Sequence, residues 1–360
     1  MNTSTSEPFA LVHIVGCGLL GTSLGLALTQ RGVTVTLEDA SPAALGLALD
    51  YDAGSSRTAD SLPPELVIVA TPPDVVGDVA RRALEEFPEA LVIDVASVKE
   101  AIYRALPGVS ARFVGTHPMA GRERGGAVSA RSDLFTARPW VICEGEDVAR
   151  QKIRAFIVSL GAIAIDMSAR EHDEAVAVVS HVPQLVASLT AARLEGATPE
   201  ALSLAGAGVR DVTRIAASDP ALWVQIVAAN SEALVGHLKS LHGDLESVIA
   251  ALEDTAAKGS KAIVSQAFHR GVTGVSRLPG KHGVSSQLAT LLVVIDDRPG
   301  ELARLLTQLG EWGVNLEDLR LEHSPGANVG FAELSLSQSA LADVESQLVD
   351  NGWKIAGEGE

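Results

Sequence analysis

Runs of apolar residues separated by helical periods fill the first part of the chain. The runs predict buried strands, at residues 9–15, 33–38, 66–70, 91–95, 112–115, 140–143 and 161–166. The periods between them predict helices, among them residues 19–31, 42–51 and 147–160. Buried strands that alternate with helices are typical of a parallel sheet covered on both faces. The pattern therefore predicts an α/β domain over residues 9–168.

The pattern changes after residue 168. Strand signals vanish between residues 169 and 257, where small and aliphatic residues at helical spacing predict an all-α region. Residues 270–286 are rich in Gly and Ser, so we interpret them as a linker that ends a helical domain of residues 169–286. The linker region 258–282 is basic and contains no Asp or Glu. A contact with the acidic body or an anionic ligand is the alternative to a solvated connection.

Residues 288–357 return to a mixed pattern. Strand, helix, two strands, helix and a short last strand follow one another. This βαββαβ order predicts a compact ferredoxin-like unit of about 70 residues.

Composition and charge narrow the classes of partner. The 360 residues include 28 Lys and Arg against 45 Asp and Glu, a formal net charge of −17. Nucleic acids and anionic membranes require a basic surface, so neither is expected as a partner. Cys17 and Cys143 are the only cysteines, and the first eight residues contain no Lys or Arg. Reduced cysteines and the missing cationic start of a signal peptide predict a cytoplasmic protein.

A glycine motif lies between the first predicted strand and helix. Residues 16–21 read G-x-G-x-x-G, a spacing that permits a tight turn, close approach of a pyrophosphate and close packing of helix and strand. Asp39 ends the second strand, where a carboxylate would bind the ribose hydroxyls of NAD and repel the 2′-phosphate of NADP. The alternative is a tight turn beside a solvated acidic pair, Glu38-Asp39. The expected cofactor is NAD, and its expected contacts are Gly16, Gly18, Leu19, Leu20, Gly21, Asp39 and Thr71.

Polar residues follow further strands of the predicted sheet. Thr71, Ser97 and the pair Thr116-His117 each come after an apolar run. Ligands of open α/β sheets bind at the carboxyl ends of the strands, so these residues are expected in one crevice with the cofactor. A histidine near neutral pKa is suited to take a hydroxyl proton during hydride transfer, which makes His117 the candidate base. A surface-loop histidine is the alternative.

The helical region carries a polar stripe. At about 100° per residue, Asp173, Ser180 and Gln184 fall on one helix face, and Pro183 should kink the helix nearby. His172 and His181 fall on opposite faces, so no metal site is expected. The stripe predicts a cleft wall, with a satisfied core network as the alternative.

Two arginines follow in the same region. Arg210 and Arg214 stand four residues apart, which predicts one shared helix face. A guanidinium can bind a carboxylate with two parallel hydrogen bonds, and an anionic small-molecule substrate of so acidic a protein needs a local positive site. Exposed ion pairs with neighbouring aspartates are the alternative.

Together these motifs resemble the prephenate/arogenate dehydrogenase family of tyrosine biosynthesis. The resemblance covers residues 10 to about 257. It rests on GCGLLGTSLG at 16–25, DVASVKE at 94–100, THPMAGRERGG at 116–126, HDEAVAVVSHVPQ at 172–184 and RDVTRIAASDPALW at 210–223.

The resemblance implies an NAD-dependent dehydrogenase that oxidatively decarboxylates prephenate to 4-hydroxyphenylpyruvate. His117 matches the family's catalytic histidine, which accepts the proton of the ring hydroxyl, and Ser97 matches the serine that binds that hydroxyl and orients the histidine. Arg214 matches the arginine that binds a substrate carboxylate, and Glu123 matches an acidic residue of the pocket. Further expected substrate contacts are His181, Gln184 and Thr116.

Gln184 departs from the family pattern. Many prephenate-using members carry a second histidine at this position, which faces the substrate side chain. A glutamine could serve the keto group of prephenate or the amino group of arogenate. Arogenate dehydrogenase, which gives tyrosine directly, is therefore the alternative activity. A hydroxyacid dehydrogenase would need a catalytic lysine in residues 169–257, and the only lysine there is Lys239, late in a helical period. A non-catalytic amino-acid sensor on a dehydrogenase fold is the alternative from another class.

Residues 289–356 resemble an ACT domain, a small-molecule sensor module. The resemblance rests on IDDRPGELARLL and GVNLEDLRLEHSPG. It implies binding of an aromatic amino-acid effector, with tyrosine expected first, at backbone groups near Gly300, Asn315 and Leu316. The apolar helical region 169–257 predicts the core of a homodimer.

Overall fold

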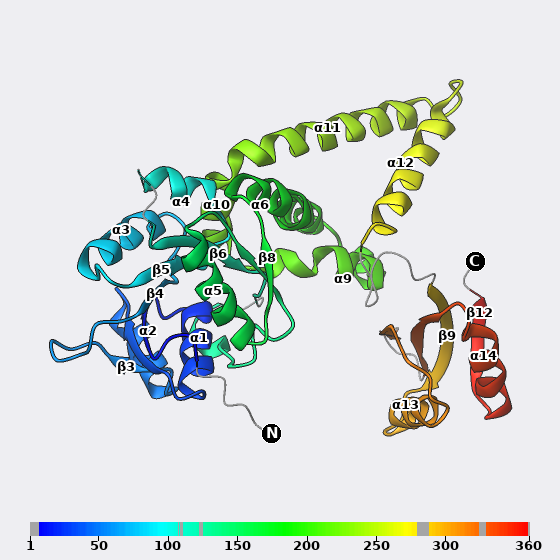
Figure 1. Cartoon of the computed structure of the whole chain (residues 1–360). Coiled ribbons are helices and arrows are strands. Elements are labelled where there is room, and N and C mark those ends of the chain that lie inside the picture. Colours follow the sequence, from blue (N-terminus) through cyan, green and yellow to red (C-terminus); the bar gives the residue numbers. More distant parts are fainter. Residues whose placement is uncertain are drawn as a thin grey trace. The chain divides into compact units, whose positions relative to one another are not determined.

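Residues 7–106, 108, 111–121, 125–278, 288–323 and 329–358 are described by the structure, a computed structural model. Contacts divide the chain into two compact units. One consists of Met1–Thr198 with Val212–Leu241, and the other of Pro199–Asp211 with His242–Glu360. Figure 1 shows the elements of each unit along the chain.

An eight-stranded sheet forms the centre of the first unit, in the order β3-β2-β1-β4-β5-β6-β7-β8. The strands are β1 (Leu11–Val15), β2 (Thr34–Glu38), β3 (Ser55–Ser56), β4 (Leu66–Val69), β5 (Leu91–Asp94), β6 (Phe113–Pro118), β7 (Pro139–Ile142) and β8 (Ile163–Asp166). All neighbours are parallel except β6 and β7, which are antiparallel. The prediction of a parallel sheet is therefore wrong at this pair. A parallel pair needs a crossover helix, and the described part of this connection contains only a 3-10 turn, Ala127–Ser129.

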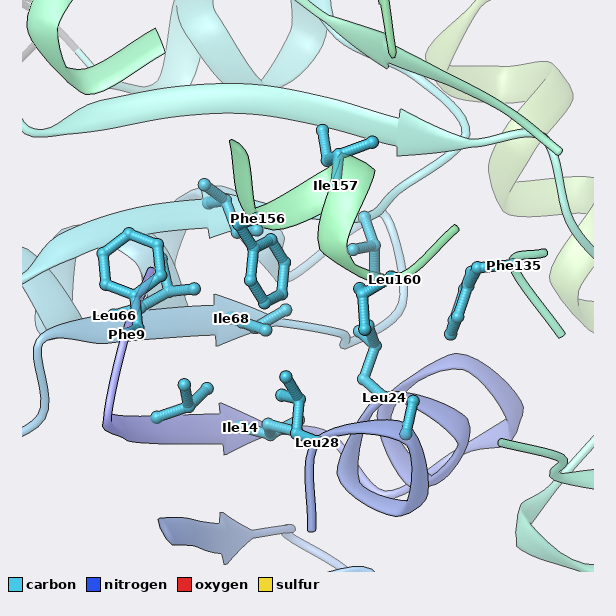
Figure 2. Packing of buried hydrophobic residues seen from close by; sticks show 14 of the residues in the cluster. Phe9, Ile14, Leu24, Leu28, Leu66, Ile68, Phe135, Phe156, Ile157 and Leu160 are labelled. Atoms are coloured by element: carbon cyan, nitrogen blue, oxygen red, sulfur yellow. The ribbon is translucent and has the colours of Figure 1, made fainter. Parts of the chain in front are cut away.

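Helices cover both faces of the sheet, as predicted. They are α1 (Leu19–Thr29), α2 (Pro42–Asp50), α3 (Val76–Glu86), α4 (Glu100–Ala105) and α5 (Asp147–Ser159). Successive strand residues point to opposite faces. Ile68 of β4 belongs to a buried cluster with Leu24 of α1 and Phe156 of α5, shown in Figure 2. Its neighbour Val67 belongs to a second cluster, with Ala80 of α3. Parallel strands buried on both faces place their carboxyl ends, and hence the predicted site, along one edge.

Helices follow the sheet from residue 169 onward, as the apolar periods predict. They are α6 (Ala169–Val176), α7 (Val182–Ala191), α8 (Pro199–Ser203), α9 (Ala207–Thr213), α10 (Pro220–Ala229), α11 (Ser231–Glu253) and α12 (Ser260–Val275). Asp219 caps α10 and accepts a hydrogen bond from the Ala221 backbone N–H. The predicted linker 270–286 is wrong over residues 270–275, which belong to α12; residues 279–286 lie outside the described residues.

A π-helical turn, Ala177–His181, joins α6 to α7. Pro183 follows it directly, and a proline lacks the backbone N–H that a regular α-helix would use there. The wider turn changes which residues share a face: Asp173, His181 and Gln184 are buried, whereas Ser180 is only half-buried. The predicted stripe is thus correct for Asp173 and Gln184 but wrong for Ser180, whose place His181 takes.

By length and composition alone, the helical run 169–194 could cross a membrane. Core helices pass the same test, and this run makes hydrogen bonds through its buried polar side chains inside the first unit.

The second unit contains a four-stranded antiparallel sheet in the order β10-β11-β9-β12. Its elements are β9 (Leu288–Asp296), α13 (Glu301–Glu311), β10 (Asp318–His323), β11 (Val329–Ser337), α14 (Leu341–Asp350) and β12 (Lys354–Glu358). Apolar residues of both helices and the sheet form one core cluster. The predicted βαββαβ order is confirmed.

Candidate active site

The glycine turn between β1 and α1 allows close backbone contacts. Gly16 has φ +106°, and a Cβ there would lie 2.4 Å from the Ala70 carbonyl oxygen. A Cβ on Gly21 would lie 1.8 Å from the Gly16 carbonyl oxygen, so helix and strand pack too closely for any side chain. Gly18 differs, because a Cβ there would meet nothing within 4 Å. The first and third glycines are thus required by packing, and the second leaves open space at the start of α1, at Leu19 and Leu20.

This open space fits the phosphates of a dinucleotide. The start of an α-helix has free backbone N–H groups that favour an anion. No side chain caps α1 at Gly18. Thr71, directly after β4, has a buried hydroxyl with no hydrogen-bond partner among the described residues. The Asp39 carboxylate accepts hydrogen bonds from the backbone N–H of Cys17 (2.6 Å) and of Ser41 (2.7 Å), which hold it beside the turn.

The structure separates the two acidic residues that end β2. Glu38 pairs with Arg82 at 2.6 Å and lies 3.6 Å from the His13 ring, whereas Asp39 lies at the glycine turn. Asp39 is therefore the better placed ribose ligand.

We expect Asp39→Ser to weaken NAD binding and to narrow the preference for NAD over NADP, because the variant loses the charge that repels a 2′-phosphate. Glu38→Gln is the matched control and should leave the preference unchanged. Kd values for both cofactors measure the effect. An unchanged ratio in Asp39→Ser together with a reduced ratio in Glu38→Gln would transfer the role to Glu38.

His117 lies at the carboxyl end of β6, two residues beyond the predicted end of this strand, and pairs in register with Val141 of β7. The side chain is only 8% exposed, and its Nδ1 lies 2.8 Å from Nε2 of His172. Burial is the main cause that lowers the pKa of His117 well below its usual value, and the nearby groups His172, Lys99 and His181 act in the same direction. The ring is therefore neutral near physiological pH, as a general base must be.

A buried polar network surrounds this histidine. His172 is hydrogen-bonded through Nδ1 to the Asp173 carboxylate at 2.7 Å. The same carboxylate accepts hydrogen bonds from the backbone N–H groups of Lys99 and Glu100, both at 2.9 Å. Asp173 thereby ties α6 to the start of α4. The Lys99 ammonium is fully buried and forms an ion pair with Asp94 of β5.

His181 is held on the other side of this network. Its Nδ1 lies 3.1 Å from Nδ2 of Asn230, which also donates to the Asp173 backbone carbonyl. Burial lowers the pKa of His181 to about 4, so the ring is neutral near physiological pH. Since Asn230 donates to Nδ1, the proton of the neutral ring is on Nε2, and His181 presents a donor.

The other predicted substrate residues do not belong to the hydrogen-bonded network around His117. Gln184 is buried and donates from Nε2 to the Ile215 carbonyl at 3.0 Å, which fixes the 3-10 turn Arg214–Ala217. Arg214 is exposed in that turn, whereas Arg210 lies in α9, so the prediction of one shared helix face is wrong.

Thr116 is fully buried; its hydroxyl donates a hydrogen bond to the Asp94 carbonyl and accepts one from the ring N–H of Trp140. These contacts make Thr116 a packing residue in this structure.

For two of the predicted substrate residues, Ser97 and Glu123, the described part of the structure gives no hydrogen bond. Ser97 is half-buried after β5, and the described residues give its hydroxyl no hydrogen bond. Glu123 lies outside the described residues. Of the groups found at the site, His172, Lys99 and Asn230 were not among the predicted site residues. The sequence indicated His172 only as a possible metal ligand, and the described residues contain no cluster that could hold a metal ion.

Comparisons with known proteins match most of the chain. Residues 24–164 match a family model described as "Prephenate dehydrogenase, nucleotide-binding domain", and residues 168–265 match "Prephenate dehydrogenase, dimerization domain". A Streptomyces niveus protein named "Probable prephenate dehydrogenase NovF" is 36% identical over 357 residues, which cover 94% of this chain and 98% of that protein. The prephenate dehydrogenase of Bacillus subtilis is 26% identical, over 86% of this chain and 87% of the relative.

A solved structure shares the fold. It is prephenate dehydrogenase from Aquifex aeolicus in complex with hydroxyphenyl propionate and NAD+, with a TM-score of 0.64 and 25% identity. The likeness covers 76% of this chain and 99% of that chain.

Proposed function

Because the chain belongs to the prephenate dehydrogenase family, we propose that it catalyses the NAD-dependent oxidative decarboxylation of prephenate to 4-hydroxyphenylpyruvate. Arogenate, which would give tyrosine directly, is the alternative substrate. The observation that carries the proposal is His117. This neutral histidine lies at the same sheet edge as the glycine turn, and its Nε2 has no hydrogen bond within the described residues.

The dinucleotide would lie along the glycine turn, with its phosphates at Gly18 and the start of α1 and its ribose at Asp39. When bound, NAD supplies the acceptor for the hydride of the carbon that bears the hydroxyl. His117 takes the hydroxyl proton on Nε2: the O–H bond breaks and an N–H bond forms. The ring carboxylate leaves as carbon dioxide, and its bonding electrons complete the aromatic ring. The proton held on Nε2 of His117 then returns to the ring oxygen, which gives the phenol of 4-hydroxyphenylpyruvate.

Other side chains would hold the substrate. Arg214 would pair with a substrate carboxylate, and the His181 Nε2–H would donate to a second acceptor. Ser97, half-buried at the end of β5, would bind the ring hydroxyl. Gln184 uses one N–H of its amide on Ile215, so its second N–H and its carbonyl oxygen remain for a substrate or a water. The N–H suits the keto oxygen of prephenate and the oxygen suits the ammonium of arogenate, so Gln184 fits either substrate.

The test is NADH formation by the purified full chain with prephenate and, separately, with arogenate. Turnover of either substrate supports the family activity, and the ratio of the two kcat/KM values assigns the preference. NADH formation from neither substrate would contradict the proposal.

We infer that the enzyme is a homodimer built on the helical region. Large apolar side chains are exposed on helices of both units, and exposed apolar surface of this kind marks interaction sites. They include Val178, Val179, Leu189 and Val224 of the first unit, and Leu245, Ile249 and Leu252 of the second. The matched family model for residues 168–265 supports this inference.

We further propose that residues 288–357 form an ACT-type regulatory domain that binds an aromatic amino acid. The βαββαβ order and the exposed edge strand β10 support it, because two such units could pair edge to edge. Gly300 caps α13 with φ +93° and has open space where a Cβ would lie. Leu316 packs against the core cluster of this unit, next to Asn315 at the end of the turn that follows α13.

Deleting the chain from residue 286 onward should leave an active dehydrogenase that no longer responds to tyrosine. The domain has its own core cluster, so its loss leaves the site around His117 complete. The measurement is tyrosine inhibition of the full and truncated chains at the same substrate concentration. Equal inhibition of both would place tyrosine in the active site, as a competing product.

A further inference from the structure

His172 stands between the candidate base and a carboxylate. Its Nε2 lies 2.8 Å from Nδ1 of His117, and its Nδ1 lies 2.7 Å from the Asp173 carboxylate. All three side chains are buried, with exposed fractions of 8% for His117, 0% for His172 and 2% for Asp173. The rings of His117 and His172 meet edge to face at 76°. The row joins three groups from two elements, β6 and α6.

The hydrogen bonds of this row determine where its protons are. The Asp173 carboxylate is an acceptor, since it already receives two backbone N–H groups. His172 must therefore donate from Nδ1, and the neutral ring then has a bare Nε2. That Nε2 can only accept, so His117 donates from Nδ1. His117 is left with a bare Nε2, the nitrogen without a hydrogen bond within the described residues.

We propose that His172, held by Asp173, is a positioning residue that fixes His117 in the tautomer with a proton on Nδ1 and a bare Nε2. The other tautomer would present an N–H to the substrate hydroxyl and could not accept its proton. A neutral imidazole in water interconverts between both tautomers, so the choice must be made by the protein. This inference rests on the proposed function, in which His117 is the base.

The same contact assists the proton transfer. Once Nε2 of His117 holds the substrate's proton, both ring nitrogens carry N–H and the ring is positively charged. Its Nδ1–H then donates to His172 as a charge-assisted hydrogen bond, backed by the Asp173 carboxylate. The titratable groups that face His117 are His172, Lys99 and His181, and each of them lowers the pKa of His117 when it is charged. Lys99 forms an ion pair with Asp94, and His172 is the hydrogen-bond partner of the His117 ring.

Two substitutions at one position separate orientation from simple packing. His172→Gln retains an oxygen that can accept from His117 and an N–H₂ that can donate to Asp173. His172→Phe fills similar space but offers neither group. We expect kcat of His172→Phe to fall by about 10²-fold or more, as expected when a general base is wrongly presented. His172→Gln should stay within about tenfold of the wild type, and KM for NAD should change little in both.

The tautomer itself is read in the free full-length enzyme, by ¹⁵N NMR of histidine-labelled protein with His117→Asn to assign the signal. The wild type and His172→Gln should show a protonated Nδ1 and a bare Nε2 at His117, and His172→Phe should lose that signature. The opposite tautomer in the wild type would overturn the proposal. So would an unchanged His117 signature in His172→Phe, or a kcat in His172→Gln as low as in His172→Phe.

The kinetic and NMR measurements still test the proposal if a variant does not fold or if neither substrate is oxidised. If His172→Phe does not fold, the wild-type tautomer and the kcat of His172→Gln still decide. If neither prephenate nor arogenate is oxidised, the proposed function fails, whereas the NMR result still reports whether His172 fixes His117.

Discussion

Replacing His117 by Asn lowers kcat by about 10²–10⁴-fold, the usual contribution of a positioned general base. Asn retains a polar group of similar size at the end of β6 but cannot take a proton. The proposed NAD site consists of the β1 turn, Thr71 and Asp39, so the Kd for NAD should stay within about twofold, since no contact of that site is removed. Stopped-flow or steady-state NADH formation, with Kd from fluorescence titration, measures both quantities.

The matched control is His242→Asn, because His242 is an exposed histidine of α11 that lies 3.6 Å from the Glu246 carboxylate. Its kcat should equal that of the wild type. A change of less than about threefold in His117→Asn, well under the 10²-fold expected of a base, would remove His117 from the mechanism.

The pH profile of the wild type gives an independent check on His117. The base works only when it is unprotonated, and burial lowers the pKa of His117 well below its usual value of 6.5. Activity is therefore retained as the pH falls from 8 towards 6.5 and is lost only as it falls through the lowered pKa. An acid limb of kcat/KM at or above 6.5 would show that His117 is more accessible to water than its burial indicates.

Arg214→Ala raises KM for the substrate far more than KM for NAD. A charge-assisted contact between a guanidinium and a carboxylate contributes about 1.5–3 kcal/mol, which corresponds to about a 10- to 150-fold increase in KM. Arg214 lies in the 3-10 turn that Gln184 holds through Ile215, away from the glycine turn in sequence and in element. Arg210→Ala is the control and should change KM by less than about threefold, as expected of an exposed residue.

The two ligands give separate readings for Arg214. Equal loss of affinity for substrate and NAD would mean that the arginine stabilises the fold instead. A larger effect in Arg210→Ala than in Arg214→Ala would exchange the roles of the two arginines.

Local chemistry made much of this molecule predictable from sequence. The glycines at 16 and 21 are required because a side chain at either would collide with backbone atoms, and this requirement is visible in their spacing. Apolar runs predicted every strand of the first sheet except the two-residue β3, because strands buried on both faces are apolar throughout. The antiparallel direction of β7 relative to β6 was not predictable, since an apolar run of residues can form a strand in either direction.

The partners of His117 were beyond sequence reasoning for a different reason. His172 is 55 residues away along the chain, and nothing local marks it as the neighbour of a strand-end histidine. Helical periodicity also failed at Ser180, because one wide turn before Pro183 adds rotation that a regular period cannot represent. Residues 270–275, the first part of the Gly- and Ser-rich segment 270–286, belong to a helix, so composition alone was a poor guide there.

The wide turn at Ala177–His181 divides one long helix into two parts whose faces are offset in rotation. The upstream part is held by Asp173, which accepts hydrogen bonds from the backbone N–H groups of Lys99 and Glu100 and carries the proposed row of His172 and His117. The downstream part is set by Gln184 at Ile215, beside the turn that carries Arg214. Mutations in the downstream part could therefore retune which side chain of a substrate is accepted without rotating the histidine row. Substrate range and proton transfer could thus evolve separately on a single helix.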